Sequence, residues 1–183
     1  MKITDILSED LVLPALAGRS KGEVIEELAG AVARRYREEV DRAKLVHALE
    51  DREKLNSTAL GEGVAIPHGK LPGLRRVIAA FGRSPLGVDF SSLDGKPTHL
   101  FFLLVAPEDS AGAHLKALAR ISRLLKDESF RQRLMRATTA ADLYRTIREE
   151  DDKYRRCACA SCSGRQARRS GCGWSPALAA SSA

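Results

Sequence analysis

The sequence predicts an α/β domain over residues 1–150, followed by a tail of different composition at 151–183. Helical and strand patterns alternate along the first 150 residues, as expected for this fold class. The composition, with 44% hydrophobic and 30% charged residues, is that of a soluble globular protein. All four cysteines lie in the tail, so the body is not a disulfide scaffold. A chain of 183 residues is long enough to form one proper core.

The first half of the body contains two predicted helices. Ser20 followed by Glu23 is a capping-box signature at the start of the first. Apolar residues then recur at helical spacing, at Val24, Ile25, Leu28 and Val32. The second helix is expected to begin near Asp41 and to end near Arg52.

The second half contains strands and then helices. Strands are predicted at 64–66, 76–83 and 99–105, and helices at 114–126, 129–136 and 140–149. The apolar run at 99–105 is typical of a central strand, and Pro107 should end it. Thr139 is the expected N-cap of the last helix.

Charge is distributed unevenly along the chain. Five arginines and no acidic residue follow Tyr154, which leaves about +1 of the net +6 for the rest of the protein. A nearly neutral body gives no electrostatic reason for nucleic acid as the main partner. The N-terminus is too acidic for a secretory signal, and no apolar segment approaches the roughly 20 residues of a membrane span. We therefore expect a cytoplasmic protein without membrane insertion.

The segment Gly61–Lys70 places one histidine, His68, directly after a short apolar run and a proline. Pro67 should end the strand because it has no N–H for the sheet. His68 is then held at a strand end, where α/β proteins commonly keep functional groups. Gly69 has no Cβ, so a phosphate or a partner's backbone could approach the ring closely.

Residues 52–70 resemble the active-site segment of the fructose/mannitol-type IIA domains of the phosphotransferase system. The resemblance extends over about residues 1–150, through the segments 87–90, 94–97, 105–108 and 113–115. Among these domains the chain is most similar to the stand-alone nitrogen-regulatory IIA proteins. The resemblance implies a single α/β domain with a mixed central sheet flanked by helices on both faces.

The resemblance also implies the site residues. His68 would accept a phosphoryl group from a phosphohistidine on a carrier protein of the HPr or NPr type. His114, at the start of a helix, would stabilise the phosphoryl oxygens, and Arg52 would neutralise the phosphate or bind the donor. Ser57, Thr58 and Gly69 would form the loop around the phosphate. The alternative for Arg52 is that it is a helix-end arginine that only complements the helix dipole. The alternative for His114 is that it makes an ordinary contact with a loop.

The implied function is that of a phosphotransferase component that acts as a stoichiometric carrier, whose phosphorylation state regulates other proteins. One alternative is a sugar-specific IIA that passes phosphate to a IIB domain for fructose- or mannitol-type uptake. The other is a docking module without phosphotransfer. It is motivated by Ala59, where the family usually has Gly, since alanine is strained if that position needs a positive φ.

Other polar residues suggest no second site. His47 is expected to be solvated on its helix, and His99 to be a hydrogen-bonded residue at a strand boundary. His68 and His114 have no third ligand at a recognisable spacing, so we expect no metal and no cofactor. The tail holds one C-x-x-C pair, Cys159–Cys162, where a zinc site needs two. We expect the tail to be disordered, because its composition cannot offset the entropy of ordering it.

Overall fold

The protein was analysed as a computed structural model that describes the backbone of residues 2–160 and the side chains of residues 2–153. Its elements are a short 3-10 helix η1 (Ile3–Asp5), β1 (Leu7–Leu13), α1 (Lys21–Arg35), α2 (Arg42–Leu55), β2 (Ala59–Gly61), β3 (Val64–Ala65), β4 (His68–Leu71), β5 (Ile78–Val88), β6 (Thr98–Pro107), α3 (Ala111–Leu125), α4 (Glu128–Arg136) and α5 (Ala140–Ala160). The predicted α/β fold class is confirmed.

The strands form one mixed sheet in the order β1-β5-β6-β3-β2, with β4 also pairing with β6. β6 is the central strand. It is antiparallel to β5 and parallel to β3 and β4. Its residues 100–107 are all buried, as the continuous apolar run in the sequence predicted.

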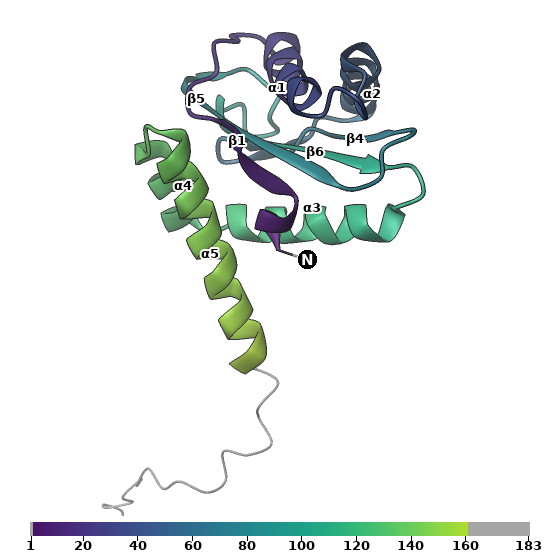
Figure 1. Cartoon of the computed structure of the whole chain (residues 1–183). Coiled ribbons are helices and arrows are strands. Elements are labelled where there is room, and N and C mark those ends of the chain that lie inside the picture. The colour runs from purple at the N-terminus through teal and green to yellow at the C-terminus, as the bar shows by residue number, and fades with distance from the viewer. Residues whose placement is uncertain (1, 161–183) are drawn as a thin grey trace, which may run out of the picture. The chain divides into compact units, whose positions relative to one another are not determined.

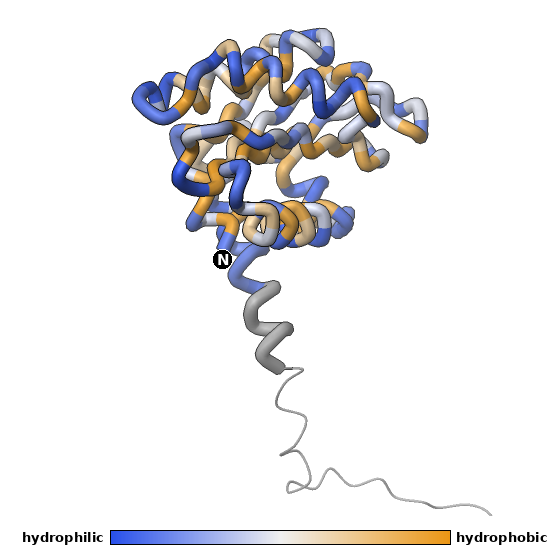
Figure 2. Tube along the Cα trace, turned by 90° about the vertical axis from the view of Figure 1, so that its right-hand side faces the viewer, coloured by the Kyte–Doolittle hydropathy of each residue, from blue (hydrophilic) through white to orange (hydrophobic). Residues whose placement is uncertain are grey.

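Helices cover both faces of the sheet (Figure 1). α1 and α2 lie on one face, where α1 contacts β1 and β5 and α2 contacts β4. α3 lies on the opposite face and packs against β6, as does α4. The apolar residues gather between these layers, as the orange segments in the interior of Figure 2 show.

Two predicted helix starts are confirmed by their capping bonds. The Ser20 side chain accepts a hydrogen bond from the Glu23 N–H at 3.4 Å, and Asp41 accepts one from the Lys44 N–H at 3.0 Å. α2 continues to Leu55, three residues beyond its predicted end. Arg52 therefore lies within the last turn of α2.

The strand that leads to His68 is interrupted and then resumes. β3 pairs Ala65 with Phe101 and β4 pairs His68 with Leu104, so both pieces keep the same register on β6. Pro67 breaks the run because it has no N–H, but its carbonyl still accepts from the Leu104 N–H at 2.9 Å. His68 thus opens a second strand segment instead of lying beyond the end of the first.

The last helix is longer than predicted. α5 runs to Ala160, whereas the sequence suggested an end near Glu149, because aliphatic periodicity stops there. Arg, Lys, Glu and Ala are good helix formers and sustain a helix without that periodicity. The compact unit that carries the sheet ends at Asp151, and the second unit, Asp152–Ala183, begins in this helix.

Asp151 joins the end of this unit to its beginning. Its side chain accepts hydrogen bonds from the Ile3 N–H at 2.9 Å and from Arg120 Nε at 2.5 Å, and the residue is only 1% exposed. The disorder expected for the tail from residue 151 is not found over 151–160, which belong to α5. For residues 161–183, which lie outside the described part of the chain, it stays a prediction.

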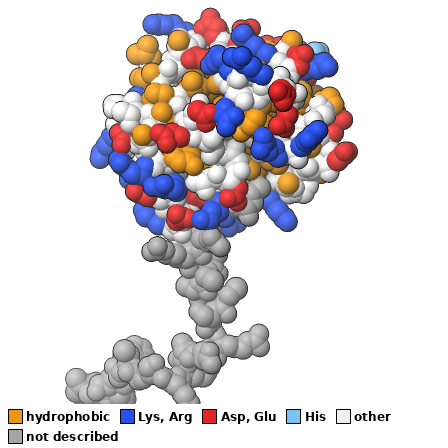
Figure 3. Space-filling model, in the orientation of Figure 1, with side chains coloured by type: hydrophobic (Ala, Val, Ile, Leu, Met, Phe, Trp, Pro, Cys, Tyr) orange, Lys and Arg blue, Asp and Glu red, His pale blue; other side chains and the backbone are white. Residues whose placement is uncertain are grey.

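On the face shown in Figure 3, Lys and Arg side chains are interspersed with Asp and Glu side chains. Within residues 2–160, no helix combines the length and apolar character that crossing a membrane requires.

Candidate functional site

Both ring nitrogens of His68 are held by the protein. Its Nδ1 lies 2.8 Å from the Ile66 carbonyl oxygen, and its Nε2 lies 3.2 Å from Arg52 Nε. The carbonyl can only accept a hydrogen bond and the guanidinium can only donate one. These partners assign the proton to Nδ1 and leave the lone pair on Nε2.

The environment of His68 favours the neutral ring. Burial lowers the pKa of His68 below its ordinary value, and the positive charge of Arg52 lowers it further. The hydrogen bond to Ile66 and the nearby carboxylate of Glu53 oppose this shift without reversing it. His68 is therefore a neutral imidazole at cell pH, with an available nucleophilic nitrogen.

His114 is brought next to His68 by α3, where it is the fourth residue. The two ring centroids lie 5.5 Å apart with the ring planes at 66°. His114 is only 8% exposed, and its Nε2 has no hydrogen-bond partner within the described part of the chain. Burial and the charges of nearby groups lower its pKa as well. The buried Nε2 of His114, which lacks a partner within the described part of the chain, therefore belongs to a ring that lies beside His68.

Arg52 joins the end of α2 to this pair. Besides its bond to His68, it donates from Nη1 to the Asn56 carbonyl oxygen at 3.1 Å. It therefore satisfies a carbonyl at the helix end and also contacts the ring. The contact with the Asn56 carbonyl fits the alternative in which Arg52 complements the helix dipole. The predicted role of Arg52 toward the phosphate or the donor stays a prediction.

Ser57 and Thr58 lie near the site, but their hydroxyl groups have protein partners. Ser57 Oγ donates to the Phe90 carbonyl oxygen at 2.9 Å and accepts from the Ala59 N–H at 3.3 Å. Thr58 Oγ1 donates to the carboxylate of Glu53 at 2.5 Å. These contacts stabilise the loop between α2 and β2 in the form described here.

Gly69 lies in β4, on the side of the sheet next to α2, and its predicted part in the loop around the phosphate stays a prediction. A Cβ at this position would point at α2, 3.4 Å from Leu49 Cδ2 and 3.6 Å from the Ala48 carbonyl. These are ordinary contact distances, so position 69 faces α2 without requiring glycine for its packing.

Ala59 lies in β2 and is buried. The non-glycine residues with positive φ in the described chain are Glu62 and Ser91, so Ala59 has an ordinary backbone conformation. The strain that motivated a docking module without phosphotransfer is absent at this position.

Glu53 was not among the residues expected at the site. Its side chain accepts from the Thr58 N–H, from Thr58 Oγ1 and from Lys21 Nζ, the last at 3.0 Å. A possible signal was its place in the last turn of a helix, where the dipole disfavours a carboxylate. A carboxylate in the last turn must be stabilised by other groups, and these three donors stabilise Glu53.

The remaining histidines have ordinary surroundings. His47 Nδ1 lies 2.8 Å from an Asp51 carboxylate oxygen on the exposed side of α2. His99 Nδ1 lies 3.0 Å from the Ser84 carbonyl oxygen, as predicted for a hydrogen-bonded boundary residue. Within the described residues, no three His, Cys, Asp or Glu side chains cluster as metal ligands. The side chains of all four cysteines lie outside the described part.

A comparison with protein families gives one match, over residues 5–150, to the phosphoenolpyruvate-dependent sugar phosphotransferase system EIIA 2 family. The chain belongs to this EIIA type-2 family. It is 45% identical to a nitrogen regulatory protein of Bradyrhizobium diazoefficiens over 80% of this chain and 95% of that one. It is 38% identical to the nitrogen regulatory protein of Pseudomonas aeruginosa over the same shares.

An EIIA type-2 domain also occurs in a much longer relative. The fructose-specific EIIABC component of Bacillus subtilis is 37% identical over 82% of this chain, but the match spans only 24% of that protein. This chain corresponds to about a quarter of it.

Solved structures of EIIA proteins share the fold. The nitrogen regulatory protein IIA-Ntr from Neisseria meningitidis matches with a TM-score of 0.74 and 34% identity, over 79% of this chain and 98% of that one. The IIA mannitol protein of Escherichia coli matches with a TM-score of 0.65 and 24% identity, over 76% and 97%. The second likeness concerns the fold alone.

Proposed function

We propose that this EIIA type-2 domain is a phosphocarrier and that Nε2 of His68 is the atom that accepts the phosphoryl group. The observation that carries the proposal is the hydrogen bond between His68 Nδ1 and the Ile66 carbonyl. It keeps the proton on Nδ1 and leaves Nε2 as the nucleophile. The lowered pKa of His68 keeps that nitrogen unprotonated at neutral pH.

The transfer step exchanges one N–P bond for another. The Nε2 lone pair of His68 attacks the phosphorus of a phosphohistidine on the donor, and the donor N–P bond breaks with its electron pair returning to the donor ring. His68 retains its Nδ1 proton, which continues to donate to Ile66. The donor ring carries a proton on its other nitrogen, so it leaves as a neutral imidazole. The positive charge passes to the His68 ring, which then holds the phosphoryl group on Nε2 and a proton on Nδ1. Because such transition states are loose, positioning and charge stabilisation supply most of the catalysis.

Arg52 and His114 supply that stabilisation. Arg52 Nε occupies the position in front of Nε2 before transfer, so it must shift to a phosphoryl oxygen as the new bond forms. The unpartnered Nε2 of His114 is suited to donate to another phosphoryl oxygen. A buried polar atom without a partner is costly in the free protein, and a phosphoryl group would satisfy it.

The donor is a small phosphohistidine carrier of the HPr or NPr type, and the downstream role is regulation of partner proteins in the cytoplasm. Support for the regulatory role comes from relatives named nitrogen regulatory proteins, which match over 95% of their length. The donor must dock, transfer phosphate and leave, which favours a modest, transient interface.

A second candidate function is that of a sugar-specific IIA that passes phosphate to a IIB domain. The match to the fructose-specific EIIABC component favours it. A IIA mannitol protein of the same fold has been solved in complex with phosphorylated IIB. Transfer of label from the phosphorylated chain to a IIB domain would identify this function.

The test is a phosphotransfer assay with labelled phosphoenolpyruvate, enzyme I and an HPr-type carrier, in which the wild type is compared with His68→Ala. Acid-labile, base-stable label on the wild type alone supports the proposal. His47→Ala is the matched control, because His47 is an exposed histidine on α2 that contacts Asp51. This variant should accept label as the wild type does. Equal label on wild type and His68→Ala contradicts His68 as the acceptor, and no label on the wild type contradicts the phosphocarrier function.

A further inference from the structure

Glu53 is a buried carboxylate one residue after Arg52, in the last turn of α2. Its two oxygens receive four hydrogen bonds. The Thr58 N–H donates to both, at 3.2 and 3.0 Å, Thr58 Oγ1 donates to Oε2 at 2.5 Å, and Lys21 Nζ donates to Oε1 at 3.0 Å. Every group that faces the carboxylate is a donor. A carboxylate can accept from all three of these donors at once.

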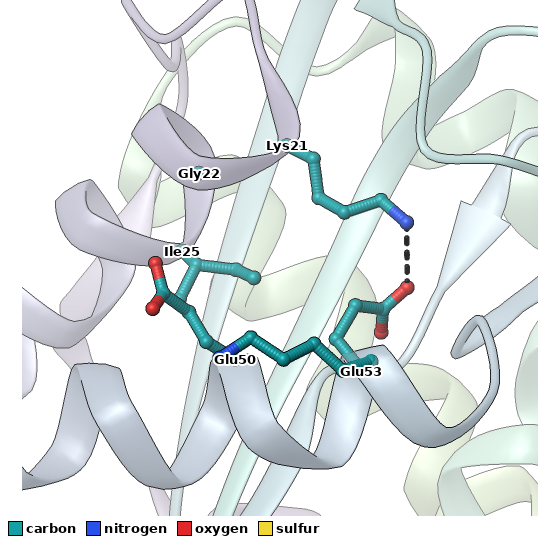
Figure 4. A pocket seen from close by; sticks show the side chains of 6 residues that line it. Lys21, Gly22, Ile25, Glu50 and Glu53 are labelled. Atoms are coloured by element: carbon teal, nitrogen blue, oxygen red, sulfur yellow. Dashed lines mark hydrogen bonds and ion pairs between the residues drawn. The ribbon is translucent and has the colours of Figure 1, made fainter.

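Lys21 reaches this carboxylate from the first residue of α1. Figure 4 shows the two side chains pointing toward one another. Both line a hollow of about 300 Å³, together with residues that include Ile25 and Glu50. The ammonium group of Lys21 also lies 4.9 Å from the centre of the Phe90 ring. The side chain of Lys21 is 29% exposed and that of Glu53 only 5%, so water can replace the lysine more easily than the carboxylate.

A series of hydrogen bonds leads from Glu53 to His68. Glu53 holds the backbone of Thr58, the Thr58 carbonyl accepts from the Ile66 N–H at 3.0 Å, and the Ile66 carbonyl faces His68 Nδ1 at 2.8 Å. The neighbour of Glu53 on the same helix turn, Arg52, contacts the other ring nitrogen. Both nitrogens of the ring are thus held by groups whose position depends on the end of α2.

We propose that Glu53, held by Lys21, is a positioning residue that fixes the tautomer and orientation of the His68 ring through Thr58 and Ile66. The proposal rests on the proposed function only in its consequence, the rate of phosphoryl acceptance. Its structural part, the Nδ1–H tautomer, is measurable without any phosphate donor.

Glu53→Gln is the sharpest variant, because its shape is preserved and one acceptor oxygen is lost. The Thr58 N–H contacts both oxygens of Glu53, so the amide NH₂ of glutamine faces that donor whichever way it is turned. The Thr58 peptide must move, and with it the carbonyl that holds Ile66. We expect a mixture of His68 tautomers and a fall of about tenfold or more in the rate of phosphoryl acceptance.

The control is Glu50→Gln, which removes the same charge one turn earlier on α2, from a residue that lines the hollow but does not contact Thr58. It should keep the wild-type rate and tautomer. The tautomer is measured by ¹⁵N NMR of the imidazole nitrogens at a pH where the ring is neutral. A variant that merely loses stability would keep the wild-type tautomer in its folded fraction.

Two further variants keep the test decisive if Glu53→Gln does not fold. Thr58→Val removes the hydroxyl bond at constant shape, and Lys21→Met removes the ammonium group. Both should shift the His68 tautomer in the same direction as Glu53→Gln. The shift should be smaller for Lys21→Met, because water can take the place of the ammonium group. Folded variants with the tautomer and rate of the wild type would overturn the proposal. If the wild type accepts no phosphate, the phosphocarrier function fails, and the tautomer comparison alone decides the role of Glu53.

Discussion

The Nε–H of Arg52 lies 3.2 Å from Nε2 of His68, the same nitrogen that the Ile66 contact leaves free to act as a nucleophile. The guanidinium therefore covers the reactive atom before transfer. In the proposed phosphotransfer, this positive charge lies where the phosphoryl group would arrive, and the guanidinium would have to move aside for the bond to form. Under that proposal Arg52 first covers the lone pair and then binds the phosphoryl group.

The first prediction concerns this arginine. Because its charge lowers the pKa of His68, Arg52→Gln should raise that pKa, and it should slow phosphoryl acceptance by about tenfold or more. An NMR titration of the His68 ring protons and the labelled-phosphate assay measure the two effects. Arg52→Lys keeps the positive charge, so the pKa of His68 should stay close to that of the wild type. The rate of phosphoryl acceptance should still fall. An unchanged His68 pKa in Arg52→Gln would contradict the electrostatic role.

The second prediction concerns His114. If its unpartnered Nε2 donates to the phosphoryl group, His114→Ala should slow acceptance by about tenfold to a hundredfold while His68 stays the labelled residue. His114→Gln retains an N–H donor and should lie between the alanine variant and the wild type. The comparison uses initial rates of label incorporation at saturating donor. Equal rates for wild type and His114→Ala would show that the buried nitrogen does not contact the phosphoryl group.

The third prediction is a pH dependence of stability. Burial lowers the pKa of both His68 and His114 in the folded protein, while in the unfolded chain each titrates near about 6.5. Below that pH the unfolded state binds protons that the folded state does not, so this stability is present above about pH 6.5 and is lost as pH falls through the folded values. Urea unfolding between about pH 7.5 and 5.5 measures the loss. The double variant His68→Gln, His114→Gln should show a weaker dependence, and an equally steep one would contradict the assignment.

The fourth prediction concerns the end of the folded unit. A chain ended at Lys153 keeps Asp151 and its bonds to Ile3 and Arg120, and should be about as stable as the full chain. A chain ended at Glu149 leaves both donors without their acceptor and should lose about 2–4 kcal/mol. Chemical unfolding of the two truncations, with Asp151→Ala as a point variant, measures this. Equal stability of the two truncations would show that Asp151 contributes little.

The fifth prediction tests the docking alternative. Ala59 has an ordinary strand backbone, so Ala59→Gly relieves no strain and should destabilise the protein by about 0.5–1 kcal/mol. Phosphoryl acceptance should not improve. A clear gain in rate for Ala59→Gly would revive the idea that this position impairs the site.

Much of the fold was predictable because its signals are local. The capping residues Ser20 and Asp41 and the apolar run at 99–105 each mark an element within a few neighbouring residues. β1 was missed because its sequence, Leu-Ser-Glu-Asp-Leu-Val-Leu, has polar residues in its first half and pairs with a strand far along the chain. The resumption of the strand at His68 was missed because a proline normally ends one.

The site was predictable only in part. The convergence of His68, His114 and Arg52 followed from resemblance to a family, and the ring centroids of the two histidines lie 5.5 Å apart. The role of Glu53 depends on donors from α1 and from the loop after α2, and no spacing in the sequence relates Lys21 to Glu53. The hydroxyls of Ser57 and Thr58 look available in the sequence, and only the structure shows that they have protein partners.

The shared register of β3 and β4 restricts how this segment can vary. Successive residues of a strand face opposite sides of the sheet, so one residue added or removed between Ala65 and His68 would turn the imidazole to the other side. The paired strand β6 cannot compensate, because it is held by β5 along its other edge. The segment between Ala65 and His68 can therefore accept substitutions but no change of length. A chain with an insertion there would keep its sheet and lose its site.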